Sequence, residues 1–230
     1  MKDPETQRLN KRLATLGLAS RREADELIAK GLVWVNGQKA ALGQQVAAGD
    51  QIEVRRPDPT YHYALYHKPR GEEMKEVYAW QGAELQALGR LDKESRGLLL
   101  LSDDRRLPSR LLDPEYGHPR EYVVEVDKHL SPSFARLLSA GIDIEGYHTQ
   151  PAEVTILDDR TFKIVMREGK KHQIRRMCSA LGFQVTDLLR TRISNLRLGN
   201  QKPGSARELR PVEKTKLLET LGLTQSRSEE

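Results

Sequence analysis

The chain has 230 residues, enough for one large domain or for a small domain joined to a medium one. Its 38 Lys and Arg residues exceed the 33 Asp and Glu residues, which favours an anionic partner such as nucleic acid, although a mildly basic surface explains the excess equally well. The single cysteine, Cys178, excludes an internal disulfide and is expected to be a buried thiol. Because the sequence shows no secretory signal and no apolar run of membrane-spanning length, we expect a soluble cytoplasmic protein without a membrane partner.

Residues 6–54 predict a small module of two helices followed by a hairpin-rich sheet. Leu9, Leu13 and Leu16 recur at helical spacing, and SRRE at 20–23 has the capping-box pattern that begins a second helix. VWVNG then alternates into an Asn-Gly pair, the strongest short signal for a hairpin. Both helices are rich in Arg and Lys, and on charge alone this describes a solvated face as well as a binding face.

The order of these signals in QRLNKRLATLGLASRREADELIAKGLVWVNGQ and GDQIEV resembles the S-four-type RNA-binding module of ribosomal proteins and RNA-modifying enzymes. In that family the two helices meet the phosphate backbone of structured RNA, and Arg and Lys on a rigid face suit this recognition by shape. Carried over by position, the resemblance implies RNA contacts from Arg12, Arg21, Arg22 and Lys30.

The sequence RRPDPTYH, residues 55–62, predicts a linker, after which strand and helix patterns are mixed. From 63 to 213 strand patterns mostly follow one another, with helices predicted in SPSFARLLSAG and KKHQIRRMCSALG. This order argues for an α+β fold and against a parallel sheet built from strand–helix–strand units. Residues 214–230 predict a short helix followed by a polar tail.

The stretch GRLDKESRGLLLLSDD, residues 89–104, places Arg90 and Asp92 before a run of leucines typical of a strand buried on both faces. A carboxylate at such a place belongs either to a turn or to an active site. No phosphate-binding loop, dinucleotide fingerprint, metal-ligand spacing or serine-nucleophile motif is present, so any chemistry falls to carboxylates, arginines or tyrosines. His172 is the best histidine candidate for a ligand contact, but a surface position on a basic helix explains it better.

Three clusters, YALYHKPRG, GRLDKESRGLLLLSDD and EGKKHQIRRMCSALGFQVTDLLRTRI, follow the N-terminal module in this order. Together they resemble the RNA pseudouridine synthases of the RsuA/RluB/RluE/RluF branch, from about residue 6 to 213. The resemblance implies a catalytic domain with a mixed, mainly antiparallel central sheet flanked by helices. It also implies an isomerase that detaches a uracil base, rotates it and rejoins it through carbon, with no metal and no organic cofactor.

In that family the aspartate of GRLD, here Asp92, acts at the anomeric carbon, either as nucleophile or as the base that promotes elimination. The QIRR arginine, Arg175, is implied to keep this carboxylate ionised, and Tyr122 of REYVVEV is implied to stack on the target base. Arg90 is implied to fill the place of the extruded base and to bind phosphate, because a uridine in folded RNA must leave its stack to be reached.

Two further residues complete the implied substrate site. Ile174 is implied to form an apolar wall of the pocket, although a core position on its helix is an equal and compatible interpretation. Lys68, with Pro69, shapes the first cluster. We place Lys68 with Arg90 and Ile174 in the substrate-binding group, as support near the pocket.

The C-terminal clusters look most like the RluF-type members, which modify large-subunit ribosomal RNA. We therefore expect a monomeric enzyme that acts on 23S rRNA or a pre-ribosomal particle, with 16S rRNA or transfer RNA as alternatives. A non-catalytic RNA-binding or ribosome-assembly protein is the alternative of another class. Two departures bear on the substrate: only 17 residues separate Gly71 from Gly89, and RRL follows LLLLSDD where relatives usually have a glycine.

Overall fold

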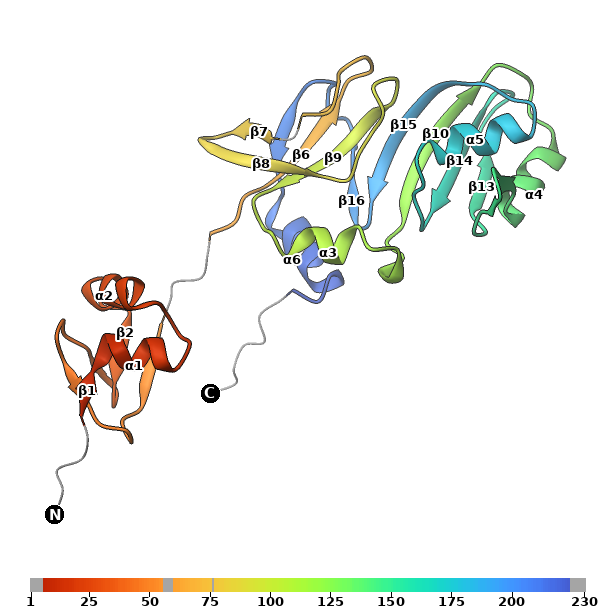
Figure 1. Cartoon of the computed structure of the whole chain (residues 1–230). Coiled ribbons are helices and arrows are strands. Elements are labelled where there is room, and N and C mark those ends of the chain that lie inside the picture. Colours follow the sequence, from red (N-terminus) through yellow and green to blue (C-terminus); the bar gives the residue numbers. More distant parts are fainter. Residues whose placement is uncertain (1–5, 56–59, 76, 224–230) are drawn as a thin grey trace. The chain divides into compact units, whose positions relative to one another are not determined.

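The computed structural model describes residues 6–55, 60–75 and 77–223. Two compact units divide between Thr60 and Tyr61 (Figure 1). The middle of the predicted linker, at 56–59, and most of the predicted polar tail, at 224–230, lie outside the described residues. Within the described ranges, no helix is long and apolar enough to cross a membrane.

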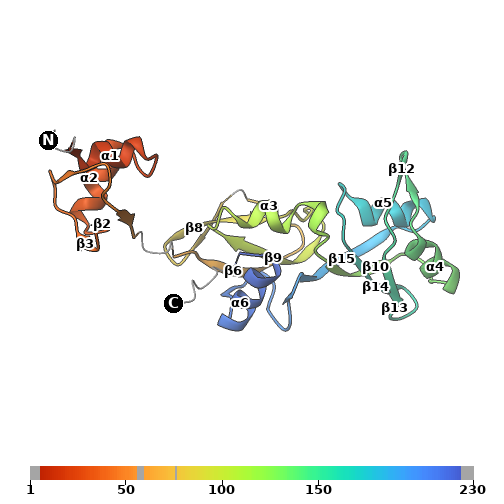
Figure 2. The ribbon, with the colours of Figure 1, turned by 90° about the horizontal axis from the view of Figure 1, so that it is seen from below.

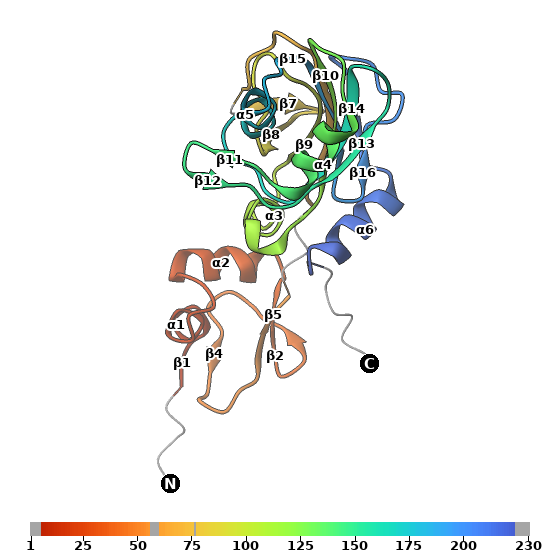
Figure 3. The ribbon, with the colours of Figure 1, turned by 90° about the vertical axis from the view of Figure 1, so that its right-hand side faces the viewer.

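The first unit packs two helices, α1 (Leu9–Thr15) and α2 (Arg21–Ala29), against one side of its short strands (Figure 3). These strands are β1 (Gln7–Arg8), β2 (Val33–Val35), β3 (Gln38–Lys39), β4 (Gln45–Val46) and β5 (Ile52–Val54). The predicted capping box begins α2, because Ser20 and Glu23 exchange hydrogen bonds between side chain and backbone. The predicted hairpin turn is formed at Asn36 and Gly37, which both have positive φ.

One apolar position predicted for the first helix is wrong. Leu9 and Leu13 are buried, but Leu16 follows the end of α1 and is 46% exposed. The reason is local, since Gly17 at φ +70° turns the chain away directly after Leu16.

The second unit begins with β6 (Tyr63–Lys68), β7 (Val77–Trp80), β8 (Ala83–Leu88), β9 (Arg96–Ser102), α3 (Leu107–Leu111) and a 3₁₀ turn (Pro114–Tyr116). It continues with β10 (Arg120–Val126), α4 (Pro132–Ala140), β11 (Asp143–Ile144), β12 (Tyr147–His148), β13 (Glu153–Ile156) and β14 (Thr161–Met166). The last elements are α5 (Gln173–Ala180), β15 (Val185–Ile193), β16 (Leu196–Arg197), β17 (Ala206–Glu208) and α6 (Pro211–Thr220).

Most strands of the second unit form a mixed sheet in the order β13-β14-β10-β15-β9-β6-β17, with β8 also paired to β9, β7 to β8 and β16 to β15, whereas β11 and β12 pair only with each other. Among the described strands of this order, β15 and β9 run parallel, whereas the other neighbours are antiparallel. The predicted α+β class with a mixed, mainly antiparallel sheet is therefore confirmed.

The leucine run forms β9, between β6 and β15 in the sheet. Leu98 and Leu100 face a core that includes residues of α3 and α6, which lie over this part of the sheet (Figure 2). Leu99 and Leu101 face the opposite core, and all four leucines are at most 2% exposed. The predicted strand buried on both faces is confirmed, so the loop that precedes β9 is attached to a rigid element.

The other half of the sheet, formed by β10, β14 and β15, packs against α4 and α5. Phe162 and Ile164 are fully buried there, beside Cys178 of α5. Burial raises the pKa of the Cys178 thiol to about 12, against the opposing effect of the nearby Arg175 cation. The predicted buried thiol is confirmed.

The two aspartates that end the leucine motif, Asp103 and Asp104, bind residues at the start of the second unit. Asp103 accepts hydrogen bonds from the backbone and ring nitrogens of His62 at 2.7 and 2.8 Å. Asp104, 1% exposed, accepts from the Tyr63 hydroxyl at 2.7 Å and from the Arg106 guanidinium at 2.8 Å. These two carboxylates therefore have structural partners and do not line the cleft described below.

Candidate active site

A cleft of about 710 Å³ opens in the second unit where β10 and β15 meet the loop before β9 and the start of α5. Its lining contains two carboxylates, Asp92 and Glu168. Basic side chains outnumber them: the lining also includes Arg90, Arg120, Lys170, Lys171, Arg175 and Arg190. The structure thus brings together predicted site residues from three separate stretches of the sequence, namely Arg90, Asp92, Tyr122, Ile174 and Arg175.

Lys68 holds the loop that carries Asp92. Its side chain is 0% exposed, and Nζ donates to the carbonyl oxygens of Pro69, Asp92, Lys93 and Ser95 at 2.9 to 3.3 Å. Burial lowers the pKa of Lys68, while nearby carboxylates oppose the shift. An ammonium enclosed by carbonyls cannot reach a ligand, so Lys68 supports the cleft without binding substrate. This corrects its place in the substrate-binding group.

Asp92 lies in this loop with its side chain 38% exposed. Its Oδ1 is 3.2 Å from Nε2 of His172, the residue that precedes α5. His172 has a left-handed backbone conformation, φ 52° and ψ 27°, which is uncommon outside glycine and occurs where the surrounding structure imposes it. The predicted surface position of His172 is confirmed, since its side chain is 48% exposed at the start of α5, and the structure adds its contact with the candidate catalytic carboxylate.

Arg175, which is implied to keep Asp92 ionised, does not pair with it directly. Both residues are described, and no ion pair joins them; the Arg175 guanidinium instead donates to the carbonyl oxygens of Val185 and Glu94 at 3.1 and 3.2 Å. A third donor bond reaches Ser95 Oγ at 3.3 Å. These acceptors hold the guanidinium against the base of the loop, so it lines the cleft near Asp92 without being its partner.

A β-bulge in β15 determines which arginine faces the cleft. Tyr122 of β10 is opposite Arg190, whereas Glu121 is opposite Arg192, so Thr191 is the additional residue. In a regular strand Arg190 and Arg192 would share one face. Because of the bulge, Arg190 lines the cleft with Tyr122, while Arg192 lies on the other side with its Nε 3.6 Å from the Glu121 carboxylate.

Arg190 also ties the Asp92 loop to the sheet. The residue is 2% exposed, with Nε donating to Leu98 O at 2.8 Å and Nη1 to Arg90 O at 3.2 Å. Its backbone passes close to Gly97, where a Cβ would lie 2.4 Å from Arg190 O. A glycine is therefore required at position 97 for β9 and β15 to approach each other.

The predicted wall residue Ile174 is 6% exposed, packs in the core beneath α5 and also lines the cleft, so both interpretations of it hold together. Arg90 has an exposed side chain at the cleft, in keeping with a contact to RNA. The functional roles of both residues stay predictions.

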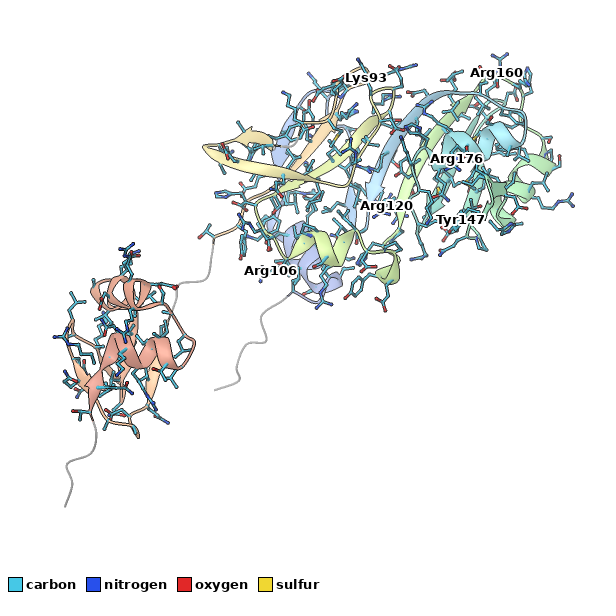
Figure 4. All side chains as sticks on the ribbon, viewed as in Figure 1. Lys93, Arg106, Arg120, Tyr147, Arg160 and Arg176 are labelled. Atoms are coloured by element: carbon cyan, nitrogen blue, oxygen red, sulfur yellow. The ribbon has the colours of Figure 1, made fainter. Side chains whose placement is uncertain are left out.

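A buried carboxylate, Glu168, fixes the turn before α5. It accepts hydrogen bonds from the Tyr147 hydroxyl, the Gln173 side chain and the backbone N–H of Gln150. These donors, the Tyr147 hydroxyl most of all, hold the pKa of Glu168 below its usual value against the effect of burial. Arg176 of α5 donates to Glu145, between β11 and β12, at 2.6 Å, and Tyr147 of β12 and Arg176 are both labelled in Figure 4. The network therefore positions the turn that ends in His172.

In the first unit, the predicted RNA-contacting residues Arg21, Arg22 and Lys30 are exposed in or directly after α2. Arg12 differs, because it is only partly exposed and its Nη2 donates to Ala48 O at 3.0 Å. RNA contact by these four residues stays a prediction.

The residues that sequence reasoning missed are Arg120 and Arg190, together with the contact that His172 makes with Asp92. A signal existed for Arg120, since it precedes Tyr122 by two positions on an alternating strand and must share its face. His172 and Arg190 are part of the third sequence cluster, but only a tertiary contact and a bulge reveal their orientation.

The fold and the cleft together indicate an enzyme that places one candidate catalytic carboxylate, Asp92, in a basic cleft. A family model described as RNA pseudouridylate synthase matches residues 62–180, and an S4 domain model matches residues 7–52. The chain therefore belongs to the RNA pseudouridylate synthase family, with an S4 domain in its N-terminal unit. The predicted family and the predicted isomerase activity are confirmed.

Individual relatives agree with this assignment. The chain is 38% identical to the "Dual-specificity RNA pseudouridine synthase RluF" of Salmonella typhi, over 88% of this chain and 75% of the relative. It is 34% identical to the "Ribosomal large subunit pseudouridine synthase B" of Bacillus subtilis (strain 168), over 92% of this chain and 95% of the relative. A solved structure described as a pseudouridylate synthase is similar with a TM-score of 0.63 and 28% identity, covering 93% of this chain and 99% of its own.

Proposed function

We propose that this RNA pseudouridine synthase isomerises one uridine of large-subunit ribosomal RNA, 23S rRNA, to pseudouridine. The observation that carries the proposal is the basic cleft around Asp92, whose volume of about 710 Å³ suits a nucleotide. The Bacillus subtilis relative, named for the ribosomal large subunit, supports the choice of RNA. The Salmonella typhi relative is named dual-specificity, so 16S rRNA or a transfer RNA is the alternative or additional substrate.

In the proposed reaction, the Asp92 carboxylate acts at the anomeric carbon of the uridine. Tyr122, on the cleft face of β10, stacks on the uracil, and Ile174 forms an apolar wall beside it. His172 orients the carboxylate through its 3.2 Å contact. Arg175 contributes positive charge near Asp92, which favours the ionised form that either nucleophile or base requires.

The RNA itself is held at two places in the proposal. Arg90, exposed at the cleft, takes the position of the extruded uridine and contacts phosphate. Arg12, Arg21, Arg22 and Lys30 of the S4 domain contact the phosphate backbone away from the target. We further propose a monomeric enzyme whose reaction takes place in the cytoplasm, where the ribosomal RNA is found.

Mapping of pseudouridines in total RNA tests the choice of substrate. A strain that lacks this protein should lose the signal at one position of 23S rRNA, and the wild-type chain should restore it, whereas Asp92→Asn should not. Loss of a position in 16S rRNA or transfer RNA alone would contradict the choice of 23S rRNA. An unchanged set of pseudouridines would contradict the proposed function.

A further inference from the structure

Two arginines of the cleft, Arg120 and Arg190, lack an anionic partner in the described part of the chain. Neither forms an ion pair there, although both side chains line the same cleft. On the opposite face of the sheet, Arg192 of β15 and Arg197 of β16 share the carboxylate of Glu121, at 3.6 and 4.0 Å. The arginines on the cleft face thus lack the carboxylate partner that the arginines on the other face have.

Arg190 carries a donor group without an acceptor. Its Nε and Nη1 bind the carbonyl oxygens of Leu98 and Arg90, but Nη2 is buried and has no hydrogen-bond partner. A buried polar group left unpaired is destabilising, so an unpaired donor beside a cleft calls for an acceptor that the chain itself does not supply. The bulge at Thr191 directs this side chain to the cleft.

Arg120 adds a second cation beside it. One of its donors, Nη2, reaches Leu111 O at 3.3 Å. Burial lowers the pKa of Arg120 and the neighbouring Arg190 cation lowers it further, so the two charges destabilise each other in the absence of an anion. The two carboxylates that line the cleft, Asp92 and Glu168, form no ion pair with either arginine in the described part of the chain.

We propose that Arg120 and Arg190 form a receptor for one phosphodiester group of the RNA, a phosphate next to the uridine that enters the cleft. Two guanidinium groups that line one cleft suit a phosphate, which accepts several charge-assisted hydrogen bonds at once. A nucleotide that leaves its stack carries its phosphate with it, and this receptor fixes the register of the uridine above Asp92. The receptor rests on the proposed function for its ligand and is separate from Arg90 at the exposed part of the cleft.

The first experiment uses inorganic phosphate as the probe and needs no knowledge of the RNA. At equal ionic strength, a saturating concentration of phosphate in place of chloride should raise the melting temperature of the wild-type chain by about 3 °C. Arg120→Gln should lose this rise, whereas Arg197→Gln, which removes an arginine 71% exposed on the opposite face, should keep it. An equal rise in all three proteins would overturn the receptor.

The second experiment uses an RNA stem–loop that contains the uridine identified by mapping, with single phosphates replaced by uncharged methylphosphonates. Binding is measured with Asp92→Asn, so that no turnover is needed. Arg120→Gln should weaken binding of the unmodified RNA about 10- to 100-fold. At one position next to the uridine, the methylphosphonate should cause the same loss, and the two changes together should cause no further loss.

The result that overturns the receptor is independent loss: Arg120→Gln and every methylphosphonate then weaken binding additively. Arg120→Lys, which keeps the charge, should bind better than Arg120→Gln. Arg190→Gln is the less informative variant, because it also removes the donors to the carbonyl oxygens of Leu98 and Arg90.

If the wild-type enzyme isomerises the uridine but no phosphate couples to Arg120, the receptor is wrong and the proposed function stands. If no uridine is isomerised, the proposed function is wrong, and the inorganic phosphate response still tests the receptor.

Discussion

Lys68 shows how one buried charge can organise the loop that carries a candidate catalytic carboxylate. Its ammonium donates hydrogen bonds to the carbonyl oxygens of Asp92, Lys93 and Ser95, which would otherwise bind water, and its aliphatic side chain is buried at the end of β6. The carboxylate thus stands on a loop whose backbone has little freedom, which is the condition for placing it accurately against a ribose.

Replacement of Lys68 by Met should destabilise the enzyme by about 3 kcal/mol, because it leaves several loop carbonyl oxygens without a donor. Urea unfolding measures this loss, and the turnover of RNA by the folded fraction should also fall. Lys93→Met is the matched control, since Lys93 lies in the same loop but pairs with Glu73 at the surface, where its side chain is 56% exposed. Equal stability of the wild type and Lys68→Met would contradict this account of the loop.

At the level of elements, two side chains attach α6 to the rest of the second unit. Leu217 packs in the core of that unit, and Glu213 lies in the first turn of the helix. Glu213 accepts hydrogen bonds from Arg207 at 2.7 and 2.8 Å and from the Arg210 side chain at 2.8 Å. The Arg207 guanidinium, with Arg210, holds the pKa of Glu213 well below its usual range against the effect of burial. The helix begins at Pro211, so it starts before the predicted boundary at 214.

This pKa shift predicts a pH dependence of stability. The folded-state pKa of Glu213 is depressed, so its contribution is fully present above the unfolded value of 4.5 and is lost as the pH falls below it. Between pH 5 and pH 3, the melting temperature of the wild type should therefore fall more steeply than that of Glu213→Gln. Glu219→Gln, an exposed change in the same helix, should keep the wild-type slope. Parallel curves for all three proteins would show that the Arg207 pair contributes nothing.

Elements with a local signal could be predicted from the sequence, and those without one could not. The capping box at Ser20, the Asn36 turn and the leucine strand all follow from short patterns. The β7–β8 and β11–β12 hairpins were missed because Gln81 and Glu145 take positive φ at their turns, a conformation for which Asn is the usual residue.

The candidate site divides in the same way. Asp92, Tyr122 and Arg175 were found through motifs, and the structure brings them into one cleft. The contact between Asp92 and His172 depends on the left-handed residue before α5, and the orientation of Arg190 depends on one additional residue in β15. The spacing of residues in one sequence reveals neither a β-bulge of one residue nor a positive φ at a histidine.

For the molecule as a whole, the two units each have a core of their own. The S4 domain places exposed basic residues on α2, whereas the second unit holds the cleft. The division of labour that this suggests is electrostatic attachment to RNA by one unit and recognition of the uridine by the other.

Salt dependence of RNA binding tests this division. Replacement of Arg21 and Arg22 by Gln should lower the slope of log K against log salt by about 1–2, because each lost phosphate contact removes roughly 0.7–0.9. Arg136→Gln with Lys216→Gln removes the same number of exposed charges from the second unit and should leave the slope nearly unchanged. Equal slopes for both double variants would mean that net charge, and not the S4 face, determines attachment.

The central claim, that Asp92 in the basic cleft isomerises uridine, is tested most directly by tritium release from RNA labelled at carbon 5 of uracil. The purified wild-type chain should release tritium, and so should Asp143→Asn, whose side chain is 82% exposed away from the cleft. Asp92→Asn should lose at least about 10⁴-fold in rate while still binding the RNA. Tritium release by Asp92→Asn at the wild-type rate would contradict the assignment of this carboxylate as the catalytic group.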